Sequence, residues 1–184
     1  VLFRSKVAVM LDDGKVTEVA RDGCFAACHS DQQAMPNGGT GNQTMYLVTS
    51  RAKMSRTGGG DPKAAEELAK MRADGAYLEY WQASVNPNAP PVVTDGTILE
   101  KRLENATPAV TATSEFTGVK WAVVFSRKLS AGAPYKDIAP GKVYTVGLAI
   151  HAGHTNHRFH YVSLERTLVL DKGPADFVAP KSGP

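Results

Sequence analysis

The sequence holds few of the residues and patterns that mark specialised protein classes. Its 184 residues include only two cysteines, too few for a disulfide scaffold, although one disulfide can still form. No run approaches the roughly 18 apolar residues of a membrane span. Lysine and arginine never gather in a block, so the net charge of +3 indicates neither nucleic acid nor a membrane surface as a partner.

Signatures of common enzyme classes are missing as well. We find no nucleophile elbow, no P-loop and no dinucleotide-binding fingerprint. The glycine-rich stretches "GGTG" and "GGGD" do not lie between a strand and a helix and lack the required lysine, so they are interpreted as loops. The protein is therefore not expected to be an enzyme by itself. Its 42% hydrophobic and 21% charged residues are typical of a soluble globular protein.

What the sequence does contain is a series of short β-prone segments separated by glycine and proline turns. "SKVAVMLDDGKVTEV" predicts a hairpin, "AYLEYWQASV" a strand, and "NPNAPPV" an irregular connector. Further strands are predicted within 107–118, 119–129, 142–151 and 157–170, and one surface helix within 61–75. We expect a mainly β protein, an immunoglobulin-like or barrel-like antiparallel sandwich over residues 1–172 with one inserted helix, and a C-terminal tail over 173–184.

The two cysteines lie in "DGCFAACHSD", with a histidine directly after the second. This arrangement resembles the c-type haem attachment signature C-x-x-C-H, but three residues separate Cys24 from Cys28. Covalent attachment needs two thiols for the two haem vinyl groups and a nearby imidazole for the iron, here His29. The extra residue requires a bulged turn, which small residues can accommodate. Met35 adds a thioether of the kind that often completes haem coordination.

Other interpretations of the same residues remain open. Cys24 and Cys28 could form a disulfide, or stay as buried thiols. They could also bind zinc, because a structural zinc site normally takes four nitrogen or sulfur ligands. Cys24, Cys28, His29 and one histidine from later in the chain would supply them.

Four of the five histidines lie together in "HAGHTNHRFH". The glycine and the strands on both sides favour a hairpin, with His151 at the end of one strand, His154 in the turn, and His157 and His160 on the next strand. Being three apart on a strand, the last two point to opposite faces. All four therefore cannot bind one ion on a regular backbone, and we expect only one or two to be metal ligands.

Four segments together carry a family resemblance: the Cys–His stretch with "MP", then "YLEYW", "WAVVFSRKL" and "GLAIHAGHTNHRFHYVSL". They resemble the cytochrome c-552 and DMSO-reductase-type γ-subunit haem-binding domain family. This family includes c-type cytochromes, some fused to NapC/NirT-type multihaem quinol dehydrogenases, and the haem b γ subunits of ethylbenzene and dimethylsulfide dehydrogenases. The resemblance extends from about residue 5 to residue 170 and implies a β-sandwich that holds one haem between its sheets and transfers electrons.

The resemblance also implies a set of haem ligands. "AACHSD" falls where the γ subunits carry a methionine ligand, which implies His29 as the proximal ligand. "RFHYVS" falls where they carry a lysine ligand, which implies His160 as the distal one. Met35 is the second choice for the distal position and His154 the third. The two cysteines depart from the haem b members, so one covalent haem c is implied, and lysine ligation is not carried over.

Residues around the haem are harder to select from the sequence. Arg51 and Arg158 could pair with the haem propionates, because a guanidinium matches a carboxylate in a bidentate way. Trp81 and Trp121 could pack on the porphyrin, but aromatic residues in strands more often belong to the core.

The leading hypothesis is a periplasmic, bis-His, monohaem c-type cytochrome. It would exchange electrons with transient redox partners, either by itself or as part of a larger, membrane-anchored oxidoreductase. One alternative is a zinc- or copper-binding sandwich that uses the same cysteines and histidines. Another is a haem-based gas sensor, in which a weak distal ligand such as Met35 or His154 gives way to a small gas molecule.

Overall fold

The structure is a computed structural model and describes residues 4–16, 19–22, 64–99, 101–153 and 161–181. This part of the chain is mainly β, as predicted. Its elements are, in chain order, β1 (Ser5–Asp12), α1 (Val19–Asp22), α2 (Ala65–Ala73), β2 (Leu78–Asn86), β3 (Ala89–Ile98), β4 (Arg102–Glu104), β5 (Thr111–Phe116), β6 (Trp121–Ser126), β7 (Val143–Ala152), β8 (Tyr161–Val162), β9 (Arg166–Leu170) and β10 (Phe177–Ala179).

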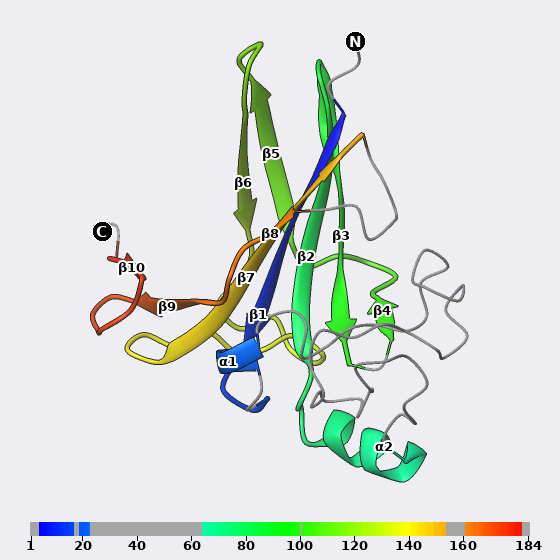
Figure 1. Ribbon diagram of the computed structural model, residues 1–184, viewed down its shortest axis with the longest axis vertical. Coiled ribbons are helices and arrows are strands. Elements are labelled where there is room, and N and C mark those ends of the chain that lie inside the picture. Colours follow the sequence, from blue (N-terminus) through cyan, green and yellow to red (C-terminus); the bar gives the residue numbers. More distant parts are fainter. Residues whose placement is uncertain (1–3, 17–18, 23–63, 100, 154–160, 182–184) are drawn as a thin grey trace.

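The strands form one large sheet and one small one. The large sheet has the order β10-β9-β7-β1-β2-β3-β4, with β8 paired to β7, and all its pairs are antiparallel except β9 with β10. The small sheet is the β5–β6 hairpin. In Figure 1, β1, β2 and β3 run along the long axis of the molecule with β7 inclined to them, and α1 and α2 lie at the lower end of the view.

The predicted N-terminal hairpin is wrong. β1 does end at the predicted Asp-Asp-Gly turn, where Gly14 N donates to Asp12 Oδ2 over 3.0 Å. The chain then continues into α1 instead of a second strand. Both edges of β1 are already occupied, because it pairs along its length with β2 on one side and β7 on the other.

The predicted irregular connector around 86–92 is also wrong. β2 and β3 are joined by a short turn at Pro87 and Asn88, and Pro90 and Pro91 lie inside β3. A β-bulge shifts the β2–β3 register between Ser84 and Asn86, opposite these prolines. Proline is tolerated there because the ladder is already interrupted.

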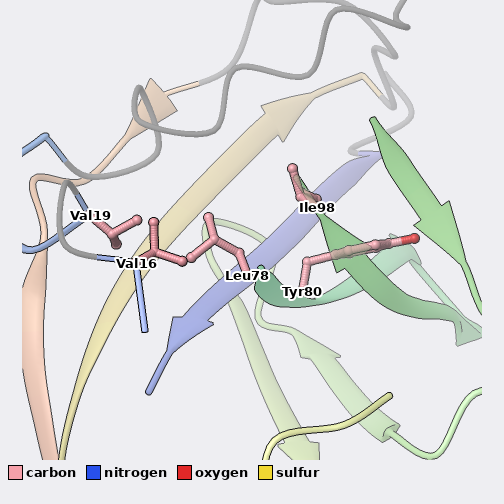
Figure 2. Close-up of a cluster of buried hydrophobic side chains, with 5 residues drawn as sticks. All are labelled: Val16, Val19, Leu78, Tyr80 and Ile98. Carbon is pink, nitrogen blue, oxygen red and sulfur yellow. The ribbon is translucent and has the colours of Figure 1, made fainter. Parts of the chain in front are cut away.

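Side chains at alternate positions of each strand point to opposite faces of the large sheet, and each face carries its own apolar cluster. One face, here called the α1 face, carries Val16, Val19, Leu78, Tyr80 and Ile98 in one cluster, with Met10 packed against it. Figure 2 shows these five clustered side chains as a row, with Val19 at one end and the Tyr80 hydroxyl at the other. The opposite face, here called the hairpin face, carries a second cluster of Leu11, Ile138, Tyr144 and Val146.

The small sheet lies over the hairpin face and makes the predicted sandwich. Trp81 of β2 meets Phe125 of β6, with 6.3 Å between ring centroids, and Trp121 packs on Phe116 within the hairpin at 4.9 Å. Trp81 therefore packs against the core of the hairpin face, and Trp121 packs within the small sheet.

A buried ionic network fastens the 127–138 segment to the hairpin face. Glu79 is fully buried, and the Arg127 side chain is only 3% exposed, with Nε 3.1 Å from Glu79 Oε1. Trp81 Nε1 and the backbone N of Lys136 donate to the same carboxylate at 2.5 and 2.7 Å. Lys136 Nζ in turn pairs with Asp13. The buried Glu79 carboxylate therefore has an ion-pair partner and two hydrogen-bond donors, which offset the cost of burying its charge.

The Asp95 carboxylate holds the 105–110 segment against the large sheet through hydrogen bonds. It is fully buried and accepts hydrogen bonds from the backbone N of Ala109 and Val110, from the Tyr135 hydroxyl and from the Asn105 amide, all between 2.8 and 3.0 Å.

Two smaller expectations can be compared with the structure. The predicted helix is α2, which has no buried residue and is followed by Gly75 in the left-handed conformation. The segment predicted to be a tail contains a strand, because Phe177–Ala179 pairs with β9 as β10. Asp176 anchors it through hydrogen bonds with the backbone and side chain of Thr167.

Replacing Gly96 with alanine is expected to destabilise the protein by about 1–3 kcal/mol, the usual cost of overpacking. A Cβ at Gly96 would lie 1.9 Å from the backbone oxygen of Leu103, so β4 would have to move away from β3. Gly147→Ala is the matched control, since its nearest atom would be Met10 Cε at 4.0 Å. Urea unfolding measures both variants, and equal midpoints for them would contradict the prediction.

Candidate functional site

The residues predicted to bind haem lie outside the described part of the chain. They are Cys24, Cys28, His29, Met35, Arg51, His154, Arg158 and His160. The structure describes the elements next to these segments in the chain: α1 before Cys24, and β7 and β8 on the two sides of residues 154–160.

These three elements lie at the large sheet, because β7 and β8 belong to it and α1 packs on it. α1 ends at Asp22, two residues before Cys24, and packs on the α1 face through Val19. β7 ends at Ala152, two residues before His154, and β8 begins at Tyr161, directly after His160. β7 and β8 pair antiparallel, with Ile150 opposite Tyr161. Antiparallel strands therefore flank the histidine cluster, as the hairpin hypothesis predicted.

His151 is the only histidine in the described part of the chain. It lies one residue before the end of β7, opposite Lys6 of β1, and is half-buried. The sequence analysis placed it at the end of a strand, which the structure confirms. Strand alternation puts its side chain on the α1 face, together with Ala149.

The α1 face is apolar next to α1 and mixed farther along the sheet. Met10 packs against the apolar cluster around α1. Ala8 of β1 pairs with Ala149 of β7 on one side but with Gln82 of β2 on the other, so methyl and amide side chains lie next to each other there. The small sheet lies over the opposite face, so the α1 face does not lie between the two sheets, where the resemblance placed the haem.

Polar groups border this apolar area. The Arg102 guanidinium of β4 lies 5.5 Å from the centroid of the Tyr80 ring. The Tyr80 hydroxyl is buried and, among the described residues, has no hydrogen-bond partner. Burial raises the pKa of Tyr80 to about 12, so the hydroxyl keeps its proton at physiological pH and remains a donor.

The described residues contain neither a membrane-spanning helix nor a cluster of metal ligands. No helix within them is long and apolar enough to cross a membrane. No group of three or more histidine, cysteine or acidic side chains within them is arranged to hold a metal ion. Of the ligands proposed for a zinc site, Cys24, Cys28 and His29 lie outside the described residues.

Comparison with known proteins identifies the family. The family model described as ethylbenzene dehydrogenase matches residues 49–163, more than half of the chain. The chain belongs to the ethylbenzene dehydrogenase family. The matched region includes α2, the strands from β2 to β8 and the segment that holds the late histidines, whereas β1, β9 and β10 lie outside it.

Two curated relatives of this family member are cytochromes by name. Cytochrome c-552 of Stutzerimonas stutzeri is 31% identical over 170 residues, which cover 90% of this chain and 50% of that protein. Cytochrome c-551 of Rhodocyclus tenuis is 27% identical over 176 residues, covering 96% of this chain and 54% of that protein. The chain thus spans about half the length of these relatives. No solved structure matches it significantly.

Sequence reasoning on this family member did not select Tyr80 or Arg102, which border the apolar area. They lie on β2 and β4, and nothing in their local patterns distinguishes them. The only available signal was strand alternation, which places Tyr80 on the same face as Leu78. The position of Arg102 over that face depends on how β4 pairs with β3, which the sequence did not predict.

Proposed function

We propose that the chain is an electron-transfer domain that carries one covalent haem c. The observation that carries this proposal is the agreement of two findings. Relatives that cover at least 90% of the chain are named cytochromes c, and the chain holds two cysteines followed by a histidine. The apolar cluster that includes Val19 of α1 supports it, because α1 ends two residues before Cys24.

In this proposal each ligand has a distinct role. Cys24 and Cys28 bind the haem covalently through a C-x-x-x-C-H motif, and His29 binds the iron on the proximal side. His160 is the distal ligand, with Met35 second and His154 third. Bound haem supplies a one-electron ferric–ferrous couple. Two histidine ligands stabilise the ferric state relative to a His–Met pair and leave no open position for oxygen chemistry.

The protein around the haem would set its properties through burial and charge. Apolar side chains such as that of Met10 would keep water from a ring bound beside α1, which influences the reduction potential. Covalent haem c further implies a periplasmic location. Electron donors and acceptors would be redox proteins that bind through small, transient interfaces, including the larger subunits of an oxidoreductase.

The absorption spectrum of the purified protein tests the proposal. A Soret band is expected, together with a pyridine haemochrome spectrum of the thioether type and an intact mass increased by one haem. Bound zinc or copper without a Soret band would contradict the proposal and favour the metal-binding alternative. Ready binding of carbon monoxide by the reduced wild-type protein would favour the gas-sensor alternative.

Replacing His160 with alanine is expected to convert the oxidised haem from low-spin to high-spin while leaving it covalently attached. Loss of the distal imidazole frees one iron position, which carbon monoxide can then occupy in the reduced protein. His157→Ala is the matched control and should keep the wild-type spectrum. A wild-type spectrum for His160→Ala, or the weak charge-transfer band of a Met–iron bond, would contradict bis-His ligation.

A further inference from the structure

A cleft at one end of the sandwich lies between β5 and the turn that joins β2 to β3. Its volume is about 580 Å³, which is typical of ligand sites. It is lined by the residues from Asn86 to Pro91, by those from Ala112 to Phe116 of β5, and by Trp121 of β6. Figure 1 shows the β2–β3 turn and the tip of the β5–β6 hairpin at the same end of the molecule. Because β6 contributes one lining residue and β5 five in a row, the cleft follows the side of β5 that faces away from β6.

The main chain of β5 has unused hydrogen-bonding groups along this side. At the hairpin turn Thr117 N donates to Lys120 O over 3.0 Å. Hydrogen-bonded and non-hydrogen-bonded pairs alternate along an antiparallel ladder. With Ser114 opposite Val123, the N–H and C=O groups of Ala112 and Ser114 therefore point away from β6. In the described part of the chain β5 pairs with no strand except β6, and nothing else bonds to these groups.

The other wall of the cleft is less able to pair with a strand. Pro90 and Pro91 lie near the start of β3 and have no N–H, and proline on a strand edge is one of the ways in which proteins limit pairing. β5 has no proline, no lysine and no bulge, so its edge is open to pairing.

Two residues that line the cleft also carry buried polar atoms without a hydrogen-bond partner in the described part of the chain. The atoms are Ser114 Oγ and Trp121 Nε1. The indole N–H can only donate, whereas the hydroxyl can donate and accept. A buried polar group without a partner is unfavourable, so a ligand with polar groups that reach these atoms gains affinity.

The charge of the cleft limits which ligand fits. Glu115 is the only charged residue among the described lining residues, and it is exposed with no ion-pair partner in the described part of the chain. Without a lysine or arginine, the lining disfavours a phosphate or a carboxylate, and the Glu115 carboxylate favours a cation. A neutral or basic peptide matches both this charge and the open strand edge.

We propose that the cleft binds an extended segment of another protein chain, which adds to the open edge of β5 as a third strand of the small sheet. Ala112 and Ser114 exchange main-chain hydrogen bonds with this segment. Ser114 Oγ and Trp121 Nε1 bond to its polar groups inside the cleft, and Glu115 selects a lysine or arginine in it. None of these residues is a proposed haem ligand, so the inference does not rest on the proposed function.

Amide hydrogen exchange of the full chain, followed by NMR, tests the proposal. The probe is a capped seven-residue peptide of alternating threonine and valine that ends in lysine. In the free protein the amides of Ala112 and Ser114 should exchange rapidly, and those of Thr113 and Glu115, which face β6, should be protected. Saturating probe should slow exchange at Ala112 and Ser114 by about tenfold, the effect of one hydrogen bond. The fully N-methylated probe has no main-chain donors and should give no protection.

Matched variants locate the interaction. Ser114→Pro removes a main-chain donor from the open edge without affecting the pairing with β6, so affinity for the probe should fall by about tenfold. Trp121→Phe keeps an aromatic ring without the N–H, and affinity should fall by about threefold. Glu115→Gln should abolish the preference for the lysine probe over one that ends in glutamate. Ser126→Ala, at an exposed position of β6, is the control and should bind the probe like the wild type.

Three results with the wild-type protein would overturn the proposal. One is rapid exchange at Ala112 and Ser114 that millimolar probe does not slow. Another is equal protection by the N-methylated probe. The third is protection of these amides in the free protein. If that protection increases with protein concentration, together with the mass measured by light scattering, a second copy of the chain occupies the edge instead. These results do not depend on whether Ser114→Pro folds.

Discussion

Replacing both Cys24 and Cys28 with serine is expected to abolish covalent haem attachment completely. In the proposed attachment, each thiol would add across one haem vinyl group: the sulfur would bond to the vinyl carbon next to the ring, and the thiol hydrogen would go to the terminal carbon. The reaction needs no oxidant. Serine hydroxyls lack the nucleophilicity for this addition, so haem in the double variant would be held only by its axial ligands.

Denaturing electrophoresis with haem staining measures this effect. The wild-type band should stain and the double-variant band should not, while each single variant keeps one thioether bond and stains. His160→Ala is the control, because it alters an axial ligand and leaves both thiols in place. Staining of the double variant at the wild-type level would contradict covalent attachment through these cysteines. The experiment also decides whether a three-residue spacer between the cysteines supports attachment.

Replacing Glu79 with alanine is expected to lower the free energy of unfolding by about 3–5 kcal/mol, the cost of breaking a buried ion pair from one side. The Arg127 guanidinium would stay buried without its carboxylate, since only 3% of that side chain is exposed. The Trp81 indole N–H and the backbone N–H of Lys136 would each lose an acceptor as well. This loss is a large fraction of the roughly 5–15 kcal/mol by which native proteins are stable.

Urea unfolding of matched variants distinguishes the ion pair from simple loss of a side chain. Glu115→Ala removes an exposed glutamate from β5 and should change stability little. The double variant Glu79→Leu/Arg127→Met should recover most of the loss, because a buried ion pair can often be replaced by packed apolar groups. A Glu79→Ala variant as stable as Glu115→Ala would show that Arg127 finds another partner.

Local sequence patterns predicted the strands in which outward-facing and inward-facing residues alternate. β5 and β6 alternate exposed and half-buried residues along their whole length, which is the period expected for a hairpin covering one face of a sheet. β2 and β7 were also predicted, because their apolar residues lie between clear turn signals.

The errors came from pairings between segments that are distant in sequence. The stretch after Gly14 has the pattern of a second hairpin strand, but β2 and β7 already occupy both edges of β1. Pro90 and Pro91 argued against a strand, yet the bulge opposite them removes the need for their N–H groups. Neither fact can be read from the segment itself, because each depends on a partner strand.

By itself, the sequence determined the chemical hypothesis for this protein. Two cysteines followed by a histidine, with more histidines late in the chain, indicate haem or metal chemistry because the reacting groups lie close together in the chain. The tertiary structure decided which residues distant in sequence lie together. Arg102 lies over the Tyr80 ring only because β4 pairs with β3 and β3 with β2. Strand pairing, and not any local motif, brings these side chains to one face of the sheet.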